Sequence, residues 1–200
     1  MFCAMDEPFD PLSGLFVAQA RRPEHLRPLN LRALAPAQRA LLVIDGTVTK
    51  FLEAFTMERI QVAQLGQVGR TLTEAHPWLE AEAGTKVVDR DVMLQGSWSG
   101  TEYAYATSVI VPDRLPEEPR RLLLEGEVGL GRILLASALE NRREVLWCGR
   151  SNGDDLPPAL AHRANQEFIV RSYRIIASGA PLMMITERFP AIIEHSLFDA

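Results

Sequence analysis

The sequence has few of the features that define several large protein classes. Its 200 residues include only two cysteines, Cys3 and Cys148, which cannot build a disulfide framework or a metal cluster, so we expect a reducing compartment. No apolar run approaches the roughly 18 residues that a membrane-spanning helix needs. The first ten residues carry acidic side chains where a signal peptide needs basic ones. The sequence therefore predicts a cytoplasmic protein without a membrane partner.

An excess of positive charge is also missing. Lysine and arginine together number 21 and aspartate and glutamate 26, which gives a formal net charge of −5. A net negative field does not attract nucleic acid or an anionic membrane surface, so we predict neither as a partner. The hydrophobic share of 47% is enough for one compact domain with a sizeable core, as a monomer or a small homo-oligomer.

The common cofactor and metal motifs are absent. The sequence contains no Walker phosphate loop, no dinucleotide-binding glycine fingerprint, no Cys-x-x-Cys and no His-Glu-x-x-His. The four histidines, at positions 25, 76, 162 and 195, lie in loop-like segments without the spacing of metal ligands. We therefore expect no metal site and no cofactor.

Strands that follow one another through short turns predict an α+β protein with a single antiparallel sheet. Residues 1–29 are rich in proline and weakly periodic, so they are expected to form an irregular arm, and residues 30–200 one domain. Within that domain the patterns predict short helices at 36–44, 47–55, 114–124 and 130–136. They predict strands at 59–68 (with a bulge near Gly66), 85–96, 103–111 and 142–149, and a final hairpin at 165–190.

Two charged residues lie within otherwise apolar strands. Alternation along a strand places Arg90 on one face with Val88, Val92 and Leu94. The same count places Glu187 with Met183 and Ile185. A cation and a carboxylate that face one cavity could hold a small anionic ligand. Two other interpretations remain open: an exposed Arg90 on an edge strand, or a buried structural ion pair between the two groups.

Two more arginines precede Glu187 in the final hairpin. Arg171 and Arg174 fall on opposite faces of their strand, so at most one of them is expected to help bind an anion.

Three segments carry a resemblance to a known family. They are residues 45–50 (Asp-Gly-Thr-Val-Thr-Lys), Arg90 followed by residues 93–96 (Met-Leu-Gln-Gly), and residues 178–187, which end in Thr-Glu. Together with Gly129-Leu130-Gly131-Arg132, and in this order over residues 30–190, they resemble the bacterial chorismate pyruvate-lyases. The similarity is greater to the branch, found in mycobacteria among others, that makes 4-hydroxybenzoate for phenolic products.

The resemblance implies a fold and a set of binding residues. It implies a chorismate lyase-like antiparallel sheet, with short helices that form flaps over an internal ligand cavity. The positions that match the family's product-contacting residues are Val48, Arg90, Leu130 and Glu187. Val48 departs from the members of the ubiquinone pathway, which have methionine there.

The resemblance also implies a cofactor-independent elimination that converts chorismate into 4-hydroxybenzoate and pyruvate. Arg90 would bind the ring carboxylate through two parallel hydrogen bonds. Glu187 would act as the acid or base, or would bind the ring hydroxyl. One alternative is a non-catalytic small-molecule-binding module of the same fold, although the sequence shows no helix-turn-helix segment. Another is a relative recruited to a different lyase or cyclase step in natural-product biosynthesis.

Overall fold

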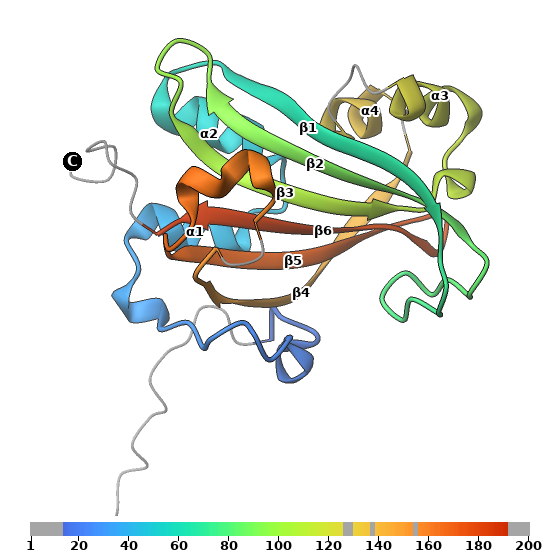
Figure 1. Cartoon of the computed structure of the whole chain (residues 1–200), viewed down its shortest axis with the longest axis horizontal. Helices are drawn as coiled ribbons and strands as arrows, with labels where there is room; N and C mark the ends of the chain where they lie inside the picture. Colours follow the sequence, from blue (N-terminus) through green and yellow to red (C-terminus); the bar gives the residue numbers. More distant parts are fainter. Residues whose placement is uncertain (1–13, 126–129, 137–138, 154–155, 192–200) are drawn as a thin grey trace, which may run out of the picture.

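The computed structural model describes residues 14–125, 130–136, 139–153 and 156–191, and Figure 1 shows the path of the chain. The helices are α1 (Pro36–Val43), α2 (Val48–Thr56), α3 (Glu117–Glu125) and α4 (Leu130–Ala136). Four 3-10 turns are η1 (Gln19–Arg21), η2 (Leu31–Ala33), η3 (Pro112–Arg114) and η4 (Pro158–Arg163). The strands are β1 (Ile60–Thr71), β2 (Lys86–Gly96), β3 (Glu102–Ile110), β4 (Asn141–Ser151), β5 (Phe168–Ala177) and β6 (Ala180–Pro190).

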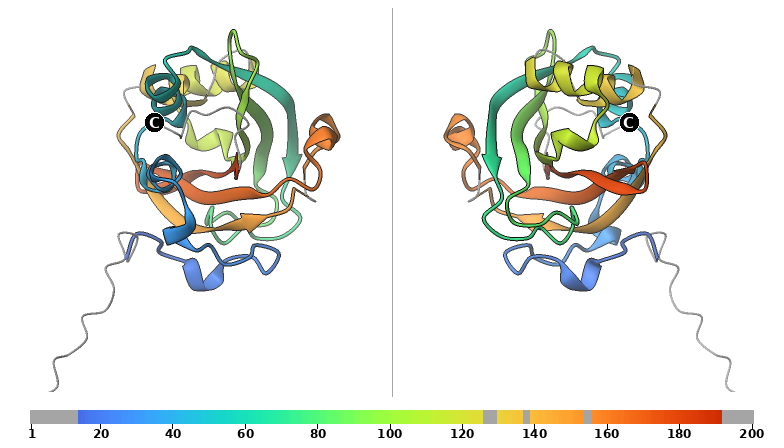
Figure 2. Two further views of the ribbon diagram at one scale, coloured as in Figure 1. Left: turned by 90° about the vertical axis from the view of Figure 1, so that its left-hand side faces the viewer. Right: turned by 90° about the vertical axis from the view of Figure 1, so that its right-hand side faces the viewer.

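The six strands form one sheet in the order β1-β2-β3-β6-β5-β4, and every neighbouring pair is antiparallel. The sheet curls strongly, and α2, α3 and α4 lie over its concave side (Figure 2). This arrangement confirms the predicted α+β class with a single antiparallel sheet and short helical covers.

Local signals explain the boundaries of the first two helices. Pro36 is the first residue of α1, where its fixed φ suits a helix and its missing N–H costs nothing. The side chain of Gln38 accepts a hydrogen bond of 2.9 Å from the backbone N–H of Ala35. Thr47 precedes α2 as the sequence predicts, but its side chain makes no capping hydrogen bond. The expected bulge is confirmed as a shift of register between Gln64 and Gly66.

The core of the concave side consists of two apolar clusters. One lies under α1 and α2 and includes Leu42, Leu52 and Phe189. The other lies under α3 and α4 and includes Leu123 and Met183. Because the clusters pack at the two ends of the concave face, they leave room for a cavity between them.

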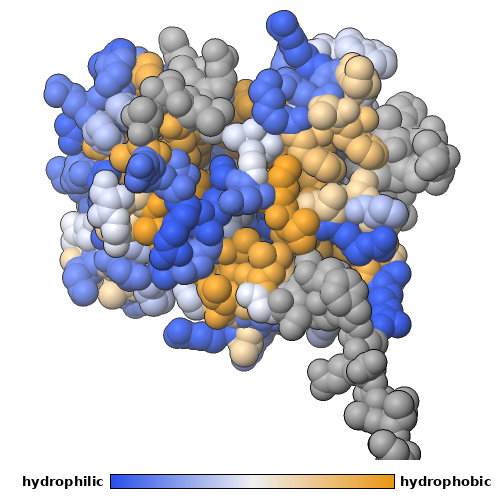
Figure 3. Space-filling view, turned by 180° about the vertical axis from the view of Figure 1, so that it is seen from behind, coloured by the Kyte–Doolittle hydropathy of each residue, from blue (hydrophilic) through white to orange (hydrophobic). Residues whose placement is uncertain are grey.

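The convex side is covered by irregular segments. Residues 14–29 run beside β4, where Val17 and Ala18 donate backbone hydrogen bonds of 2.9 Å to Val145 and Leu146. The arm therefore lies against the sheet, while its separation from a domain at residues 30–200 stays a prediction. Seen from behind, the apolar surface gathers in the middle of the molecule and hydrophilic residues dominate around it (Figure 3). No helix among the described residues is both long enough and apolar enough to cross a bilayer.

Candidate active site

A cavity of about 860 Å³ lies between the concave face of the sheet and the first turns of α2 and α4. Its volume falls within the range of roughly 300–1,000 Å³ that is typical of small-molecule sites. The structure brings all four residues of the predicted site to this cavity. Val48 begins α2, Leu130 begins α4, Arg90 lies on β2 and Glu187 lies on β6.

Small residues on β3 form the floor of the cavity. The register pairs Arg90 with Ser108 and Glu187 with Ala106, so β3 lies between the strands that carry the two charged residues. Large side chains at these two positions would fill the space in front of the sheet. The alternation Tyr-Ala-Tyr-Ala-Thr-Ser at residues 103–108 contains this signal, since every second residue is small.

Arg90 is 3% exposed and points into the cavity with Val92 and Leu94, which confirms the predicted face. Its Nε donates a hydrogen bond of 3.2 Å to Oε1 of Gln64 on the neighbouring strand β1. Burial lowers the pKa of Arg90, but an arginine pKa starts so high that the guanidinium stays charged. The site thus presents a poorly solvated cation, which an anionic ligand would stabilise.

Glu187 forms an ion pair with Arg171, its cross-strand neighbour on β5. The Nη2 and Nε atoms of Arg171 lie 2.6 and 3.1 Å from Oε2 of Glu187. The third nitrogen, Nη1, donates to the backbone oxygen of Ile44 at 3.0 Å. The buried ion-pair partner that the structure shows for Glu187 is therefore Arg171.

Tyr173 completes the surroundings of Glu187. Its hydroxyl donates to Oε1 of Glu187 at 3.0 Å. Burial raises the pKa of Tyr173, so this hydroxyl stays protonated and remains a donor. A carboxylate offers about four acceptor positions. Three are used by Arg171 and Tyr173, which leaves one acceptor position on Oε1 for a ligand.

The sequence did not identify Arg171 as the partner of Glu187. It did predict that Arg171 and Arg174 lie on opposite faces, and the structure confirms this. Arg174 binds Glu144 at 2.5 Å and Glu80 at 2.9 Å on the other side of the sheet. Tyr173 shares the face of Arg171 by the same alternation, so strand parity could have found it.

The helical cover of the cavity depends on a close approach of α4 to α2. A Cβ atom at Gly131 would lie 3.1 Å from Cγ2 of Thr47, so glycine allows the two helix starts to pack together. Leu130 and Val48 then reach the cavity from neighbouring positions. Gly129 lies outside the described residues.

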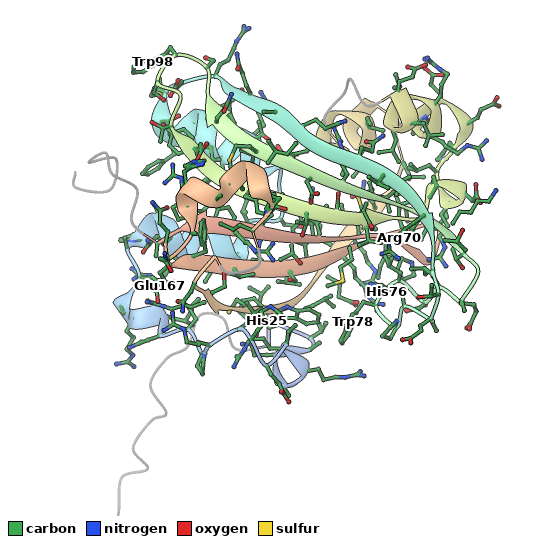
Figure 4. The ribbon with its side chains drawn as sticks, in the orientation of Figure 1. His25, Arg70, His76, Trp78, Trp98 and Glu167 are labelled. Carbon is green, nitrogen blue, oxygen red and sulfur yellow. The ribbon has the colours of Figure 1, made fainter. Side chains whose placement is uncertain are left out.

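Among the described residues, no histidine lines the cavity. His25 and His76 belong to loops near the edge of the molecule (Figure 4), and His195 lies outside the described residues. The expectation of a reaction without metal or cofactor stays a prediction.

The fold and the site define an α+β protein with one antiparallel sheet and a cavity of small-molecule size, which is lined by a cation and a paired carboxylate. The family model described as "Chorismate pyruvate-lyase Rv2949c-like" matches residues 42–197, and the chain belongs to this family. It is 32% identical to a chorismate pyruvate-lyase from Mycobacterium leprae over 165 residues, which cover 80% of this chain and 76% of the relative. It is 30% identical to one from Mycobacterium tuberculosis over 169 residues, 80% of this chain and 82% of the relative.

Solved structures share the fold at low sequence identity. The effector domain of PhnF from Mycobacterium smegmatis matches with a TM-score of 0.58 and 12% identity, over 82% of this chain and 91% of that one. A GntR-family transcriptional regulator from Bacillus cereus matches with a TM-score of 0.52 and 10% identity, over 66% and 91%. The same architecture therefore occurs in transcriptional regulators.

Proposed function

We propose that this protein is a chorismate pyruvate-lyase that converts chorismate into 4-hydroxybenzoate and pyruvate. The observation that carries the proposal is the joint placement of Arg90 and Glu187 in one cavity of suitable volume. Membership of the family and the names of the mycobacterial relatives support the same activity.

The two charged residues suit the two ends of the product ring. The strands β2 and β6 are separated by β3, so the backbones of Arg90 and Glu187 are two strand spacings apart, roughly 10 Å along the sheet. Both side chains reach into the space over the small residues of β3. The guanidinium of Arg90 would clamp the ring carboxylate, and Oε1 of Glu187 would accept a hydrogen bond from the ring hydroxyl.

The reaction depends more on how the substrate is positioned than on additional reactive groups. The ether bond between the ring and the enolpyruvyl group breaks, and the neighbouring ring carbon loses its hydrogen. The electron pair of that C–H bond completes the aromatic ring, and the departing group gains the proton and becomes pyruvate. Formation of the aromatic ring supplies much of the driving force, so a rigid site that holds the reacting conformation contributes most of the catalysis.

Of the two roles open to Glu187, the contacts favour hydroxyl binding. Arg171 donates two hydrogen bonds to Oε2 and Tyr173 donates one to Oε1, so the groups around this carboxylate use it as a hydrogen-bond acceptor. The single remaining position on Oε1 then orients the ring hydroxyl, which is attached to the carbon that loses its hydrogen.

The test is to incubate the purified protein with chorismate and to measure both products. We expect equal amounts of 4-hydroxybenzoate and pyruvate. Arg90→Met should lower kcat/KM by about 10- to 100-fold, since hydrogen bonds to charged groups contribute about 1.5–3 kcal/mol. Arg70→Met is a matched control, because Arg70 pairs with Asp89 at the surface of neighbouring strands. Tight binding of 4-hydroxybenzoate without turnover of chorismate would instead indicate a binding module.

A third result would indicate recruitment to another reaction. If the protein neither converts chorismate nor binds 4-hydroxybenzoate, the fold persists with a changed substrate, and the lyase proposal fails.

A further inference from the structure

A second arginine, Arg143 of the edge strand β4, lines the same cavity. Its Nη1 donates to the backbone oxygen of Asp45. Its Nε is buried and has no hydrogen-bond partner among the described groups. The nearest carboxylate oxygen, that of Asp45, lies 3.8 Å away on a side chain that is 85% exposed. Such a pair is weak and well solvated, so the charge of Arg143 is largely available to a ligand.

The residues that line the cavity carry more positive than negative charge. Glu187 is already paired with Arg171 behind the lining, and Glu53 lies 2.6 Å from Lys50. The described residues of the lining have a formal charge of +2, which equals in magnitude the charge of a dicarboxylate. The charged lining residues are Lys50, Arg59, Arg90 and Arg143 against Glu53 and Glu187.

Arg90 and Arg143 reach the cavity from opposite walls. The register runs from Arg90 across β3, β6 and β5 to Val145 of β4, and Arg143 lies two residues from Val145 on the same strand. Four strand spacings separate β2 from β4, roughly 19 Å along a flat sheet, and the curl of the sheet turns the two walls toward each other (Figure 2). Because their strands are four spacings apart in the sheet, we expect a ligand with one carboxylate to bind one of these guanidiniums at a time.

The side chain of Arg143 is also held near Glu187 by a contact with the ring of Tyr173. Its guanidinium carbon lies 5.9 Å from the centre of the Tyr173 ring, whose hydroxyl binds Glu187. This contact with the aromatic face restrains the long side chain without using its buried Nε. The arginine is thereby held close to the hydroxyl-binding end of the cavity.

We propose that Arg143 is a specificity residue that binds the second carboxylate of a dianionic substrate. If the proposed function holds, on which this assignment rests, that group is the carboxylate of the enolpyruvyl side chain. Arg90 and Arg143 then select the dianionic substrate over aromatic acids with one carboxylate. The product ring has lost the second carboxylate and with it the contact to Arg143, so it keeps only the contacts to Arg90 and Glu187 and leaves more easily.

The test uses two stable probes that differ in one carboxylate. The first is 3-(carboxymethoxy)benzoate, which carries an ether-linked carboxylate meta to the ring carboxylate, and the second is 3-methoxybenzoate. Titration calorimetry should show that Arg143→Gln weakens the dicarboxylate by about 10- to 100-fold, the loss of one charge-assisted hydrogen-bonded contact. Binding of the monocarboxylate should change less than about twofold, which is under 0.5 kcal/mol.

Two further variants separate binding from folding. Arg142→Gln is the matched control, because Arg142 is the neighbouring residue, is 65% exposed and binds Glu144. It should leave the affinity for both probes unchanged. Arg143→Lys should restore part of the dicarboxylate affinity, because it keeps the charge and loses the planar fork.

Equal weakening of both probes in Arg143→Gln would overturn the proposal, because it would indicate a general effect on the cavity. Unchanged binding of both probes would overturn it as well. A preference for the dicarboxylate that depends on Arg143 would support it even if the wild-type protein releases no 4-hydroxybenzoate from chorismate. In that case the proposed reaction fails and the second anion subsite stands.

Discussion

Ala106 separates the two charged residues of the site, and its size determines whether a ring fits between them. It pairs with Val92 on one side and with Glu187 on the other, and it lines the cavity. Its neighbour Ala104 is 1% exposed and belongs to the packed core under α1 and α2. On one face of β3, the methyl group of Ala104 therefore packs in the core, while that of Ala106 leaves space for a ligand.

This difference gives a prediction for two leucine substitutions. Ala106→Leu should abolish the binding of 4-hydroxybenzoate and the turnover of chorismate while the protein keeps its melting temperature, because the new side chain enters open space. Ala104→Leu should instead destabilise the protein by about 1–3 kcal/mol, the usual cost of an overfilled core. Calorimetry with 4-hydroxybenzoate and thermal unfolding measure the two effects. Normal ligand binding in Ala106→Leu would show that the ligand lies elsewhere.

The contact between Arg171 and Glu187 could not be predicted from strand parity, which gives the face of a residue but not its partner on the neighbouring strand. Ser178 and Gly179 have φ values of +51° and +81°, so they form a two-residue turn that pairs Ala177 with Ala180. A regular ladder from that turn would place Arg171 opposite Thr186. The register shift between Ile175 and Ile176 moves it opposite Glu187. The sequence shows the face of each residue, but nothing in it marks this shift.

Local sequence patterns therefore predicted most helices, strands and turns, but they could not predict the order of the strands in the sheet. Pro36, the bulge at Gly66 and the turn at Ser178 are signals within a few residues of the features they determine. The strand order β3-β6-β5-β4 depends on pairings across the whole domain. Arg143 escaped prediction for this reason, because only that order brings β4 to the wall opposite Arg90.

The end of α2 is fixed to the β2–β3 hairpin by one buried carboxylate. Met57 ends the helix with φ of +54°, and Glu58 follows it. The carboxylate of Glu58 accepts hydrogen bonds from the backbone N–H groups of Trp98 and Ser99, both at 2.8 Å, and from Oγ of Ser99 at 2.9 Å. A Cβ atom at Gly96 would collide with this carboxylate, so glycine is required there. Trp98 itself points away from the body of the protein at the tip of the hairpin (Figure 4).

Glu58 should make the stability of the protein depend on pH. Burial opposes its ionisation, but the hydrogen bonds from Ser99 and Trp98 outweigh burial and hold the pKa of Glu58 below its usual value of 4.5. The stabilisation is therefore complete above about pH 4.5 and is lost as the pH falls through the lower pKa of the folded state. Glu58→Gln should lower the melting temperature at pH 7 by a few degrees, because a neutral amide oxygen accepts weaker hydrogen bonds from the N–H groups of Trp98 and Ser99 than a carboxylate does.

The check is a series of thermal unfolding curves between pH 7 and pH 3. The difference in melting temperature between wild type and Glu58→Gln should shrink as the pH falls below 4.5. Glu24→Gln, at an exposed position of the arm, should follow the wild type throughout. A difference that stays constant with pH would mean that the hydrogen bonds do not favour the ionised carboxylate.

The arm at residues 14–29 packs against β4 and β5 and should contribute to the stability of the whole protein. Leu26 is 3% exposed and packs in one cluster with Trp147 and Phe168. The side chain of Gln19 pairs with both backbone groups of Cys148, donating to its oxygen and accepting from its nitrogen at 2.9 Å each. The arm thus covers apolar residues of β4 and β5 and satisfies backbone groups that the edge strand β4 would otherwise expose.

These contacts predict that residues 30–200 are less stable alone than the whole chain. Leu26→Ala should lower the free energy of unfolding by about 2–5 kcal/mol, as is typical when a buried leucine is truncated. Deletion of residues 1–29 should cost at least as much, since it removes the same leucine together with the backbone pairing along β4. Urea unfolding of the three proteins measures both effects. If the truncated chain unfolds at the same urea concentration as the full chain, residues 30–200 are an independent domain and the arm contributes nothing to its folding.

If the truncated chain unfolds at a lower urea concentration, the position of β4, the strand that carries Arg143, depends on the arm. Binding of the dicarboxylate probe to the truncated chain should then be weaker as well.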